Sequence, residues 1–319
     1  MALTINSIFA GDYAKAIYKD LAIGNEVITG NKYSDGGIAY LELDVPDKRE
    51  LRYASQTARP FGEWKQSPVT GDITVSTTID KRELDLEKVM IYEEFVPSDY
   101  DLEWEDLRSV GSQTEHMLNP NVFREILTLL VPNAGAHISE LFFEGDKAGS
   151  GGLEYMNGIF TKAVADANTL KATSIGAITT GNAVNAFTNV IDKIPSKDYL
   201  NDAYKILCSM DDFRILQRVN TQTKQTSDGV LNDTMKNLLE EKKIVPFVGL
   251  GKNHIIATKT GESPDSNLHL AFWFDEMREM QDIRVGRVAE NSELWFMRIN
   301  LKLDANYKKS DNVIIYNGI

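Results

Sequence analysis

The chain has 319 residues, of which 42% are hydrophobic and 25% charged, a composition typical of a soluble globular protein with one large or two ordinary domains. No apolar run is long enough to span a bilayer, and the N-terminus lacks the basic head and apolar run of a secretory signal, so we expect folding in a cytoplasm. The net charge of −13 argues against a protein that grips nucleic acid, because phosphate contacts need dense Lys and Arg, but not against one that surrounds it.

The N-terminal quarter predicts an arm followed by a long hairpin. Residues 1–35 form a short arm with an amphipathic helical pattern. Within residues 36–79, the segments 38–45 and 73–79 are strand-like, and the stretch 49–71 between them is rich in Arg, Gln, Ser, Pro and Gly. A polar tip of this length leaves strand edges uncovered, so we expect another subunit to cover them.

Acidic strands and a long helix follow the hairpin. Residues 80–106 are strand-like and strongly acidic. Asn119-Pro120 has the chemistry of a helix start, and an apolar face continues to Glu144, which predicts one long helix interrupted near Pro132 or two helices in series. A small, flexible segment, residues 145–152, ends this half.

From Gly158 onward the pattern predicts a second domain of mixed helices and strands. The expected helices and strands alternate along the chain, and the last strand could return to the first domain. In order they are helix Thr180–Ile194 ended by Pro195, strand Tyr204–Cys208, helix Asp211–Val219, a polar loop Asn220–Gly229, and strands Ile244–Val248, His254–Thr258, Leu294–Leu303 and Val313–Tyr316.

A search for chemistry finds no catalytic, cofactor-binding or metal-binding constellation. Cys208 lies in an apolar strand and is interpreted as a buried small hydrophobe. Adjacent carboxylates on a strand point to opposite faces, so Glu93 and Glu94 cannot share a proton as a catalytic dyad. Asp211 and Asp212 fit a helix cap and its first turn.

The four histidines lie far apart in the sequence and have no metal-ligand spacing. His254 and His269 both lie in or beside strands and are interpreted as ordinary half-buried or surface residues.

The order of these elements resembles the Hong Kong 97-like major capsid protein of tailed bacteriophages. The segment 205–216, KILCSMDDFRIL, is similar to the strand-then-helix passage of that family's axial domain. The segments 243–248, KIVPFV, and 253–258, NHIIAT, resemble the two strands that follow it.

The resemblance implies an α+β fold of four parts. These are an N-terminal arm (1–35), an extended hairpin loop (36–79), a peripheral domain with a long spine helix (80–157 and 291–319) and an axial α/β domain (158–290). It implies a structural, non-enzymatic protein whose pentamers and hexamers build an icosahedral or prolate shell around double-stranded DNA, without sequence-specific binding. The arm has only about 35 residues, so we expect no long cleaved segment and a separate scaffolding protein, with a portal and a decoration protein as further partners. The implied location is the virion capsid, assembled in the host bacterial cytoplasm.

Two other classes stay open at this point. An encapsulin shell shares the fold and encloses an enzyme in place of DNA. An α/β enzyme of unrecognised class could use Glu93 or Asp99 in an acidic pocket.

Charge indicates which residues of the hairpin and the acidic strands meet between subunits. Residues 52–71 hold three basic residues and one acid, a net of +2, whereas residues 80–106 hold eleven acids and three basic residues, a net of −8. A basic loop tip and an acidic surface are complementary between two copies, although the acids could equally form a solvated face. The predicted inter-subunit contacts are Arg52, Arg59, Phe61, Trp64, Lys65, Glu83, Asp85, Glu87, Glu93 and Glu94.

Overall fold

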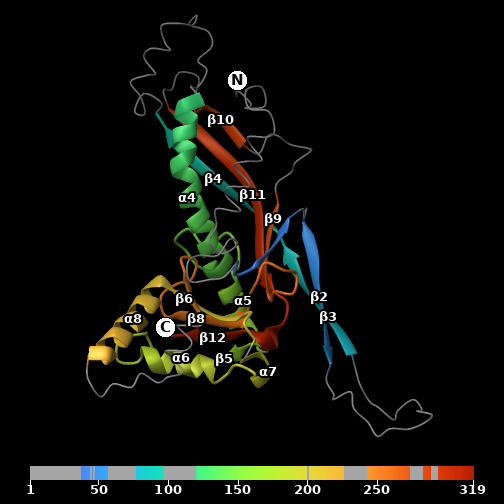
Figure 1. Cartoon of the computed structure of the whole chain (residues 1–319). Helices are drawn as coiled ribbons and strands as arrows, with labels where there is room; N and C mark the ends of the chain where they lie inside the picture. The colour runs from blue at the N-terminus through green and yellow to red at the C-terminus, as the bar shows by residue number, and fades with distance from the viewer. Residues whose placement is uncertain are drawn as a thin grey trace, which may run out of the picture.

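The computed structural model describes residues 37–43, 45, 47–56, 77–96, 120–199, 201–225, 243–273, 283–288 and 294–319. These residues form two five-stranded sheets, a separate hairpin and several helices (Figure 1). The mixture confirms the predicted α+β class.

The first sheet is built around one long strand. Residues 295–303 of β11 pair antiparallel with β4 on one side, and the opposite side pairs with β10 and then with β9. The sheet has the order β1-β9-β11-β10, with β4 also on β11. The strand bounds are β1 Tyr40–Leu43, β4 Glu87–Phe95, β9 Leu268–Trp273, β10 Ile283–Arg287 and β11 Trp295–Tyr307.

Helix α4, Pro120–Glu144, runs lengthwise over this sheet (Figure 1). It begins at the predicted proline but continues unbroken through Pro132, so the expected interruption is wrong. A proline inside a helix removes one backbone hydrogen bond, and packing of the following turns offsets that cost. Those turns bury Ile138, Leu141 and Phe142 in one core with residues of β4 and β11.

The second sheet has the order β5-β12-β8-β6-β7 and is covered on both faces. One face shares the core of α4 and α5, and the other packs against α6 and α8. The bounds are β5 Leu170–Lys171, β6 Tyr204–Ser209, β7 Ile244–Phe247, β8 His254–Lys259, β12 Ile314–Asn317, α5 Ile159–Ala165, α6 Ala183–Ile191 and α8 Met210–Gln225, with short helices α7 Ser196–Tyr199 and η3 Ser310–Asn312.

Burial on both faces explains the continuous apolar runs in these strands. Successive side chains of a strand point to opposite faces, so Leu207 and Ile256 enter the core of α4 while Ile206 and Ile255 enter the core of α6 and α8. Cys208 is fully buried as predicted, and burial raises the pKa of its thiol.

Helix α8 is capped by Ser209 and not by the predicted aspartates. The Asp212 backbone N–H donates to Ser209 Oγ at 3.1 Å, and the Ser209 hydroxyl donates to Asp212 Oδ2 at 2.8 Å. Asp211 and Asp212 occupy the first turn, where negative charge is favourable. The helix extends to Gln225, which corrects the loop expected from residue 220.

The hairpin differs from its prediction in register and in partner. Strand β2, Lys48–Gln56, pairs antiparallel with β3, Thr77–Asp85. The segment expected to form its first arm instead supplies β1, which pairs in parallel with β9, more than two hundred residues away in the sequence. Alternating apolar residues specify a strand but not its partner.

The strands near the C-terminus are divided between the two sheets. Strands β9 and β10, expected in the axial domain, belong to the first sheet, and the terminal strand β12 belongs to the second. The limits of the four predicted parts remain a prediction.

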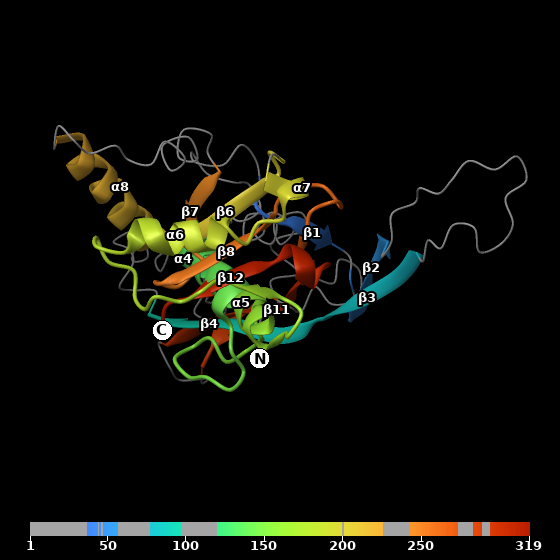
Figure 2. The same ribbon diagram turned by 90° about the horizontal axis from the view of Figure 1, so that it is seen from below.

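The hairpin and α8 extend from opposite sides of the body, as Figures 1 and 2 both show. None of the described helices is long and apolar enough to cross a membrane.

Three glycines allow close backbone contacts around the end of α4, where the two sheets share one core. A Cβ on Gly158 would lie 2.4 Å from the Phe143 carbonyl oxygen, and one on Gly145 would lie 2.5 Å from that of Met156. A Cβ on Gly249 would lie 2.7 Å from the Ser139 carbonyl oxygen. These contacts are with backbone, which cannot rotate away as a flexible side chain can.

We therefore expect Gly158→Ala to destabilise the subunit by about 1–3 kcal/mol or more, through overpacking. Gly135→Ala is the matched control. Its Cβ would meet no atom of the described residues within 4 Å, and Ala is favoured over Gly inside a helix, so this variant should stabilise the subunit by about 0.5–1 kcal/mol. Urea unfolding of unassembled subunits measures both, and equal effects of the two variants would contradict the close packing.

Candidate inter-subunit surfaces

The β2–β3 hairpin projects from the body of the described chain (Figure 1). Its nine-residue strands pair only with each other among the described residues. Leu51 and Leu84 are buried in a small cluster at its base with Val45 and Leu86, whereas Ile79 is 74% exposed farther along. A lone two-stranded hairpin is marginal in water, so its outer part needs a surface to lie on.

Several charges on the described part of the hairpin are paired within the chain. Lys48 Nζ lies 2.8 Å from Asp85 Oδ2, Lys81 Nζ lies 2.6 Å from Glu50 Oε1, and Arg52 Nη2 lies 2.8 Å from Glu50 Oε2. The hydrogen bond to Asp85 raises the pKa of Lys48, and the bonds from Lys81 and Arg52 lower the pKa of Glu50. Arg52 and Asp85, two predicted contacts, therefore already have partners, although both remain exposed.

The acidic residues of β4 are divided between its two faces. Glu94 is exposed and accepts a hydrogen bond from the Tyr92 hydroxyl at 2.8 Å, while Glu93 is half-buried on the opposite face. Glu87 forms an ion pair with Lys147, which follows α4. On β3, the exposed Glu83 uses its carbonyl oxygen to accept a hydrogen bond from Asn306 at 2.7 Å.

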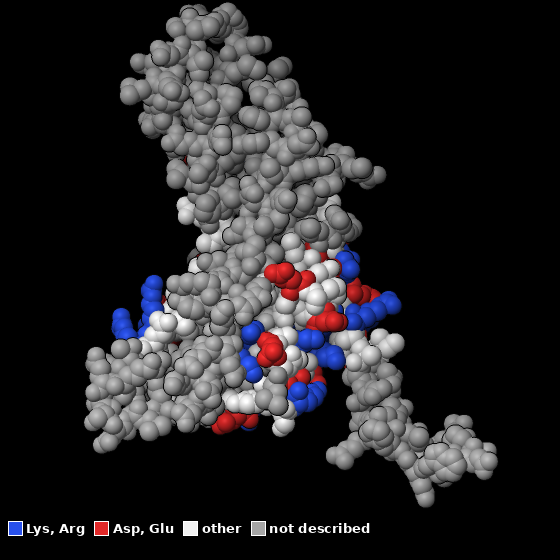
Figure 3. Space-filling view, in the orientation of Figure 1, with Lys and Arg blue, Asp and Glu red and all other residues white. Residues whose placement is uncertain are grey.

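The remaining predicted contacts, Arg59, Phe61, Trp64 and Lys65, lie outside the described residues, as does Asp99. The contact surface as a whole stays a prediction. Acidic and basic side chains lie intermixed around the place where the hairpin leaves the body (Figure 3).

One face of β4 also carries exposed apolar side chains that the charge pattern did not indicate. Met90 is 53% exposed and Tyr92 46% exposed, and the Tyr92 ring stacks on Phe296 of β11 with centroids 5.9 Å apart. The opposite face of the same sheet is buried by α4.

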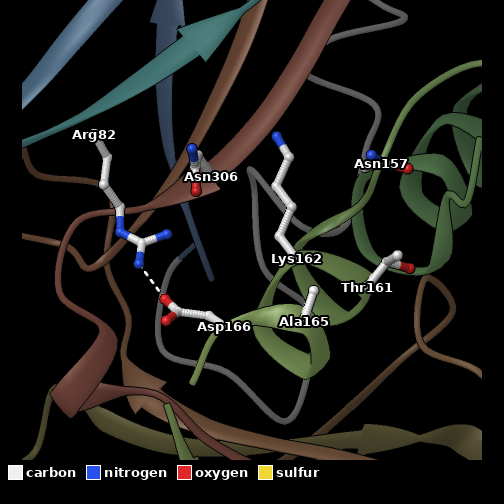
Figure 4. A pocket seen from close by; sticks show the side chains of 7 residues that line it. All are labelled: Arg82, Asn157, Thr161, Lys162, Ala165, Asp166 and Asn306. Atoms are coloured by element: carbon white, nitrogen blue, oxygen red, sulfur yellow. Dashed lines mark hydrogen bonds and ion pairs between the residues drawn. The ribbon is translucent and has the colours of Figure 1, made fainter. Parts of the chain in front are cut away.

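An ion-pair cluster fixes the root of the hairpin to the body. Arg82 of β3 binds Asp166, which directly follows α5 (Figure 4). The Nη2 group of Arg82 also donates to Ser310 Oγ at 2.5 Å. Asp166 also accepts hydrogen bonds from the hydroxyls of Tyr307 and Ser310, both at 2.9 Å. The guanidinium carbon of Arg82 lies 4.2 Å from the centroid of the Tyr307 ring.

A second ion pair lies beside the first. Lys162 Nζ of α5 lies 2.7 Å from Asp304 Oδ1 of β11, and the Asp85 backbone N–H donates to Asp304 Oδ2 at 2.8 Å. Burial raises the pKa of Asp304, and the Lys162 charge opposes that rise. Sequence reasoning missed both pairs, but Arg82 shares a strand face with the buried Leu84 and Leu86, and a charged residue on such a face indicates a buried partner.

Two histidines are more buried than predicted because each has a carboxylate partner. His254 Nδ1 lies 2.9 Å from Glu144 Oε1 at the end of α4, and the His254 ring stacks on Phe160. His269 Nδ1 lies 3.1 Å from the buried Glu42 Oε1, which corrects the expectation of half-buried or surface residues. Burial and the Lys308 charge lower the pKa of His269, against the effect of Glu42.

No protein-family model matches the chain, and no characterised protein matches its sequence. Solved structures do match its fold. The satellite phage P4 procapsid, solved with its size determination protein, has a TM-score of 0.53 at 10% identity, covering 88% of this chain and 93% of the other. The capsid of the Myoviridae phage XM1 has a TM-score of 0.50 at 9% identity, covering 93% and 91%.

A virus-like particle from Pyrococcus furiosus has a TM-score of 0.50 at 8% identity, and the match covers 96% of this chain and 98% of the other. The fold is therefore that of proteins that form capsids and similar particles. The predicted resemblance to the Hong Kong 97-like major capsid protein is confirmed at the level of the fold.

The ion-pair cluster around Asp166 makes the stability of the subunit depend on pH in the acidic range. Burial alone would raise the pKa of Asp166, but hydrogen bonds from the Asn168 backbone, Ser310, Arg82 and Tyr307 outweigh it and lower the pKa to about 2, from 3.8. A lowered native pKa means that this stabilisation is complete above the unfolded value and is lost as the pH falls from about 4 toward 2.

We therefore expect Asp166→Asn to lower the unfolding free energy of the subunit at pH 7 by about 2 kcal/mol or more, and the difference from the parent to shrink toward pH 2. Asp211→Asn is the control, because Asp211 is 63% exposed and its ion pair with Arg214 is 3.4 Å long. Denaturation curves between pH 2 and 7 measure both. A pH-independent deficit in the Asp166 variant would show that its carboxylate charge is not the cause.

Proposed function

We propose that this chain is a structural major capsid protein. In this proposal it assembles as pentamers and hexamers into an icosahedral or prolate shell that encloses phage double-stranded DNA. The virion capsid is its location, assembly takes place in the host bacterial cytoplasm, and a separate scaffolding protein, a portal and a decoration protein are its partners.

The observation that carries the proposal is the β2–β3 hairpin. It leaves the body as a separate two-stranded sheet, and among the described residues no third strand pairs with it. The chain shares its fold with two phage capsid structures. This likeness supports a neighbouring copy as the surface on which the outer part of the hairpin lies.

A shell that encloses an enzyme is the second candidate. The virus-like particle of Pyrococcus furiosus, which matches over nearly the whole chain, supports a particle-forming fold without selecting its cargo. The net charge of −13 suits a wall that leaves enclosed DNA mobile, but it does not select the cargo. A gene neighbourhood with a portal and a terminase would favour the phage.

Electron microscopy of the purified protein tests the proposal directly. We expect pentamers, hexamers or closed shells, because the hairpin edges are satisfied only between copies. A well-folded, strictly monomeric protein at high concentration would refute it. Nuclease-protected DNA inside the shells would then separate the capsid from the enzyme container.

Charge reversal on the loop tests how neighbours attract. We expect Arg52→Glu with Arg59→Glu to leave subunits folded but to slow or block shell closure, and salt to weaken assembly of the parent. Exposed pairs contribute only about 0.2–1 kcal/mol each, so the effect should appear mainly in the rate. The double Lys variant at the same positions keeps the charge and should assemble at close to the parent rate. Normal kinetics of the Glu variant, with an unchanged salt response, would rule out the charge account.

Copies in different shell positions should differ most in residues 36–79 and 145–152, because one sequence must fit several environments. Superposing the independent subunits of a shell tests this, and identical conformations in both segments would refute it.

A further inference from the structure

An open cavity of about 440 Å³, lined mostly by residues with polar side chains, lies at the root of the hairpin. Side chains from β3, α5 and β11 surround it, so it lies where the hairpin meets a helix and the first sheet (Figure 4). Its lining residues are Arg82, Asn157, Thr161, Lys162, Ala165, Asp166 and Asn306.

The carboxylate and side-chain amide oxygens around this cavity each already accept a hydrogen bond. Asp166 receives Arg82, Tyr307 and Ser310 on Oδ2 and the Asn168 backbone N–H on Oδ1. The amide oxygen of Asn306 accepts the Tyr307 N–H at 2.9 Å, and that of Asn157 accepts the Lys147 N–H at 2.9 Å. Behind the cavity, both oxygens of Asp304 are also bonded.

The donors around the cavity are not all used. Among the described residues, the Nε and Nη1 groups of Arg82, the amide nitrogen of Asn157 and the hydroxyl of Thr161 have no hydrogen-bond partner. Lys162 donates to Asp304 and to the Ala305 carbonyl oxygen, which leaves the third of its N–H groups. Figure 4 shows the second terminal nitrogen of Arg82 pointing away from Asp166 into the space between the labelled side chains.

The basic side chains are also more exposed than the carboxylates that balance them. The exposed fractions are 23% for the Arg82 side chain against 14% for Asp166, and 24% for Lys162 against 5% for Asp304. Because the unused groups are donors on these more exposed side chains, the cavity favours an anion with several acceptor atoms, although its formal charges cancel.

We propose that this cavity is an oxyanion site, and that its occupant is a carboxylate side chain of a second copy of the chain. The occupant rests on the proposed function, in which a neighbour packs beside the hairpin root. The chain carries 47 acidic against 34 basic residues, so a neighbouring copy has carboxylates in excess. Arg and Lys donors bind carboxylate and phosphate through the same charge-assisted hydrogen bonds, so inorganic phosphate is a probe of the site.

Substitution of Ala165 tests the site without breaking its ion pairs. Ala165 lines the cavity, is exposed, and is the last residue of α5. A165E brings a tethered carboxylate to the unused donors, and A165Q has nearly the same size without the charge. Thr161→Val removes one donor and keeps the shape.

Phosphate binding to unassembled subunits is measured by calorimetry at low ionic strength, with chloride at equal ionic strength as the reference. We expect the parent and A165Q to bind one phosphate per subunit, A165E to bind about tenfold or more weakly, and Thr161→Val to fall between them. Equal binding by A165E and A165Q, or none by the parent, would overturn the oxyanion site.

The assembly rate then identifies the occupant. We expect A165E to form shells more slowly than A165Q, because the introduced carboxylate fills the place of the neighbour's carboxylate. For the same reason, millimolar phosphate should slow the assembly of the parent and of A165Q. Normal assembly of A165E would overturn the neighbour as occupant and point to a free anion. If not even the parent forms shells, the proposed function fails, whereas phosphate binding by subunits still decides the site.

Discussion

The shared core at the end of α4 is the contact on which the rest of the structure depends. Phe142 and Phe143 lie in a single cluster with residues of both sheets, and the Phe143 ring meets Phe247 of β7 with centroids 4.6 Å apart. Glu144, the last residue of the helix, accepts the Gly251 N–H at 2.9 Å and binds His254. Because close-packed interiors deform little, this shared core holds the two sheets in a fixed arrangement.

The hairpin is attached to that body by polar contacts more than by apolar area. Its apolar base cluster is small, whereas Arg82–Asp166 and Lys162–Asp304 join β3, α5 and β11. Ion pairs that lose much of their water contribute less to stability than apolar packing of the same volume, but their directional bonds fix orientation. At the root of a projecting hairpin, orientation is what matters, since a small rotation there displaces the far end most.

Local patterns predicted much of the fold, and long-range pairing explains what they missed. Four of the five strands of the second sheet, all but β5, and the start of α4 at Pro120 could be predicted because continuous apolar runs and a proline at the first turn have local causes. The partner of β1 could not, because β9 is a non-local choice among several apolar strands. The Arg82 cluster was likewise hidden, since Asp166 and Ser310 are 84 and 228 residues away in the sequence.

The difference between a local pattern and the actual pairing also matters for the charges of this protein. Net charges of sequence segments suggested a basic loop against an acidic surface, yet Arg52, Lys48 and Lys81 each have an acidic partner within the hairpin. Segment charge therefore overstates the attraction available to a neighbour, because paired charges at high dielectric act over short distances only. Unused hydrogen-bond donors do lie at the cavity beside Arg82, and in the proposed assembly these are what a neighbouring copy would meet there. Recognition by such a site depends on geometry, so it discriminates between correct and incorrect neighbours better than a difference in net charge can.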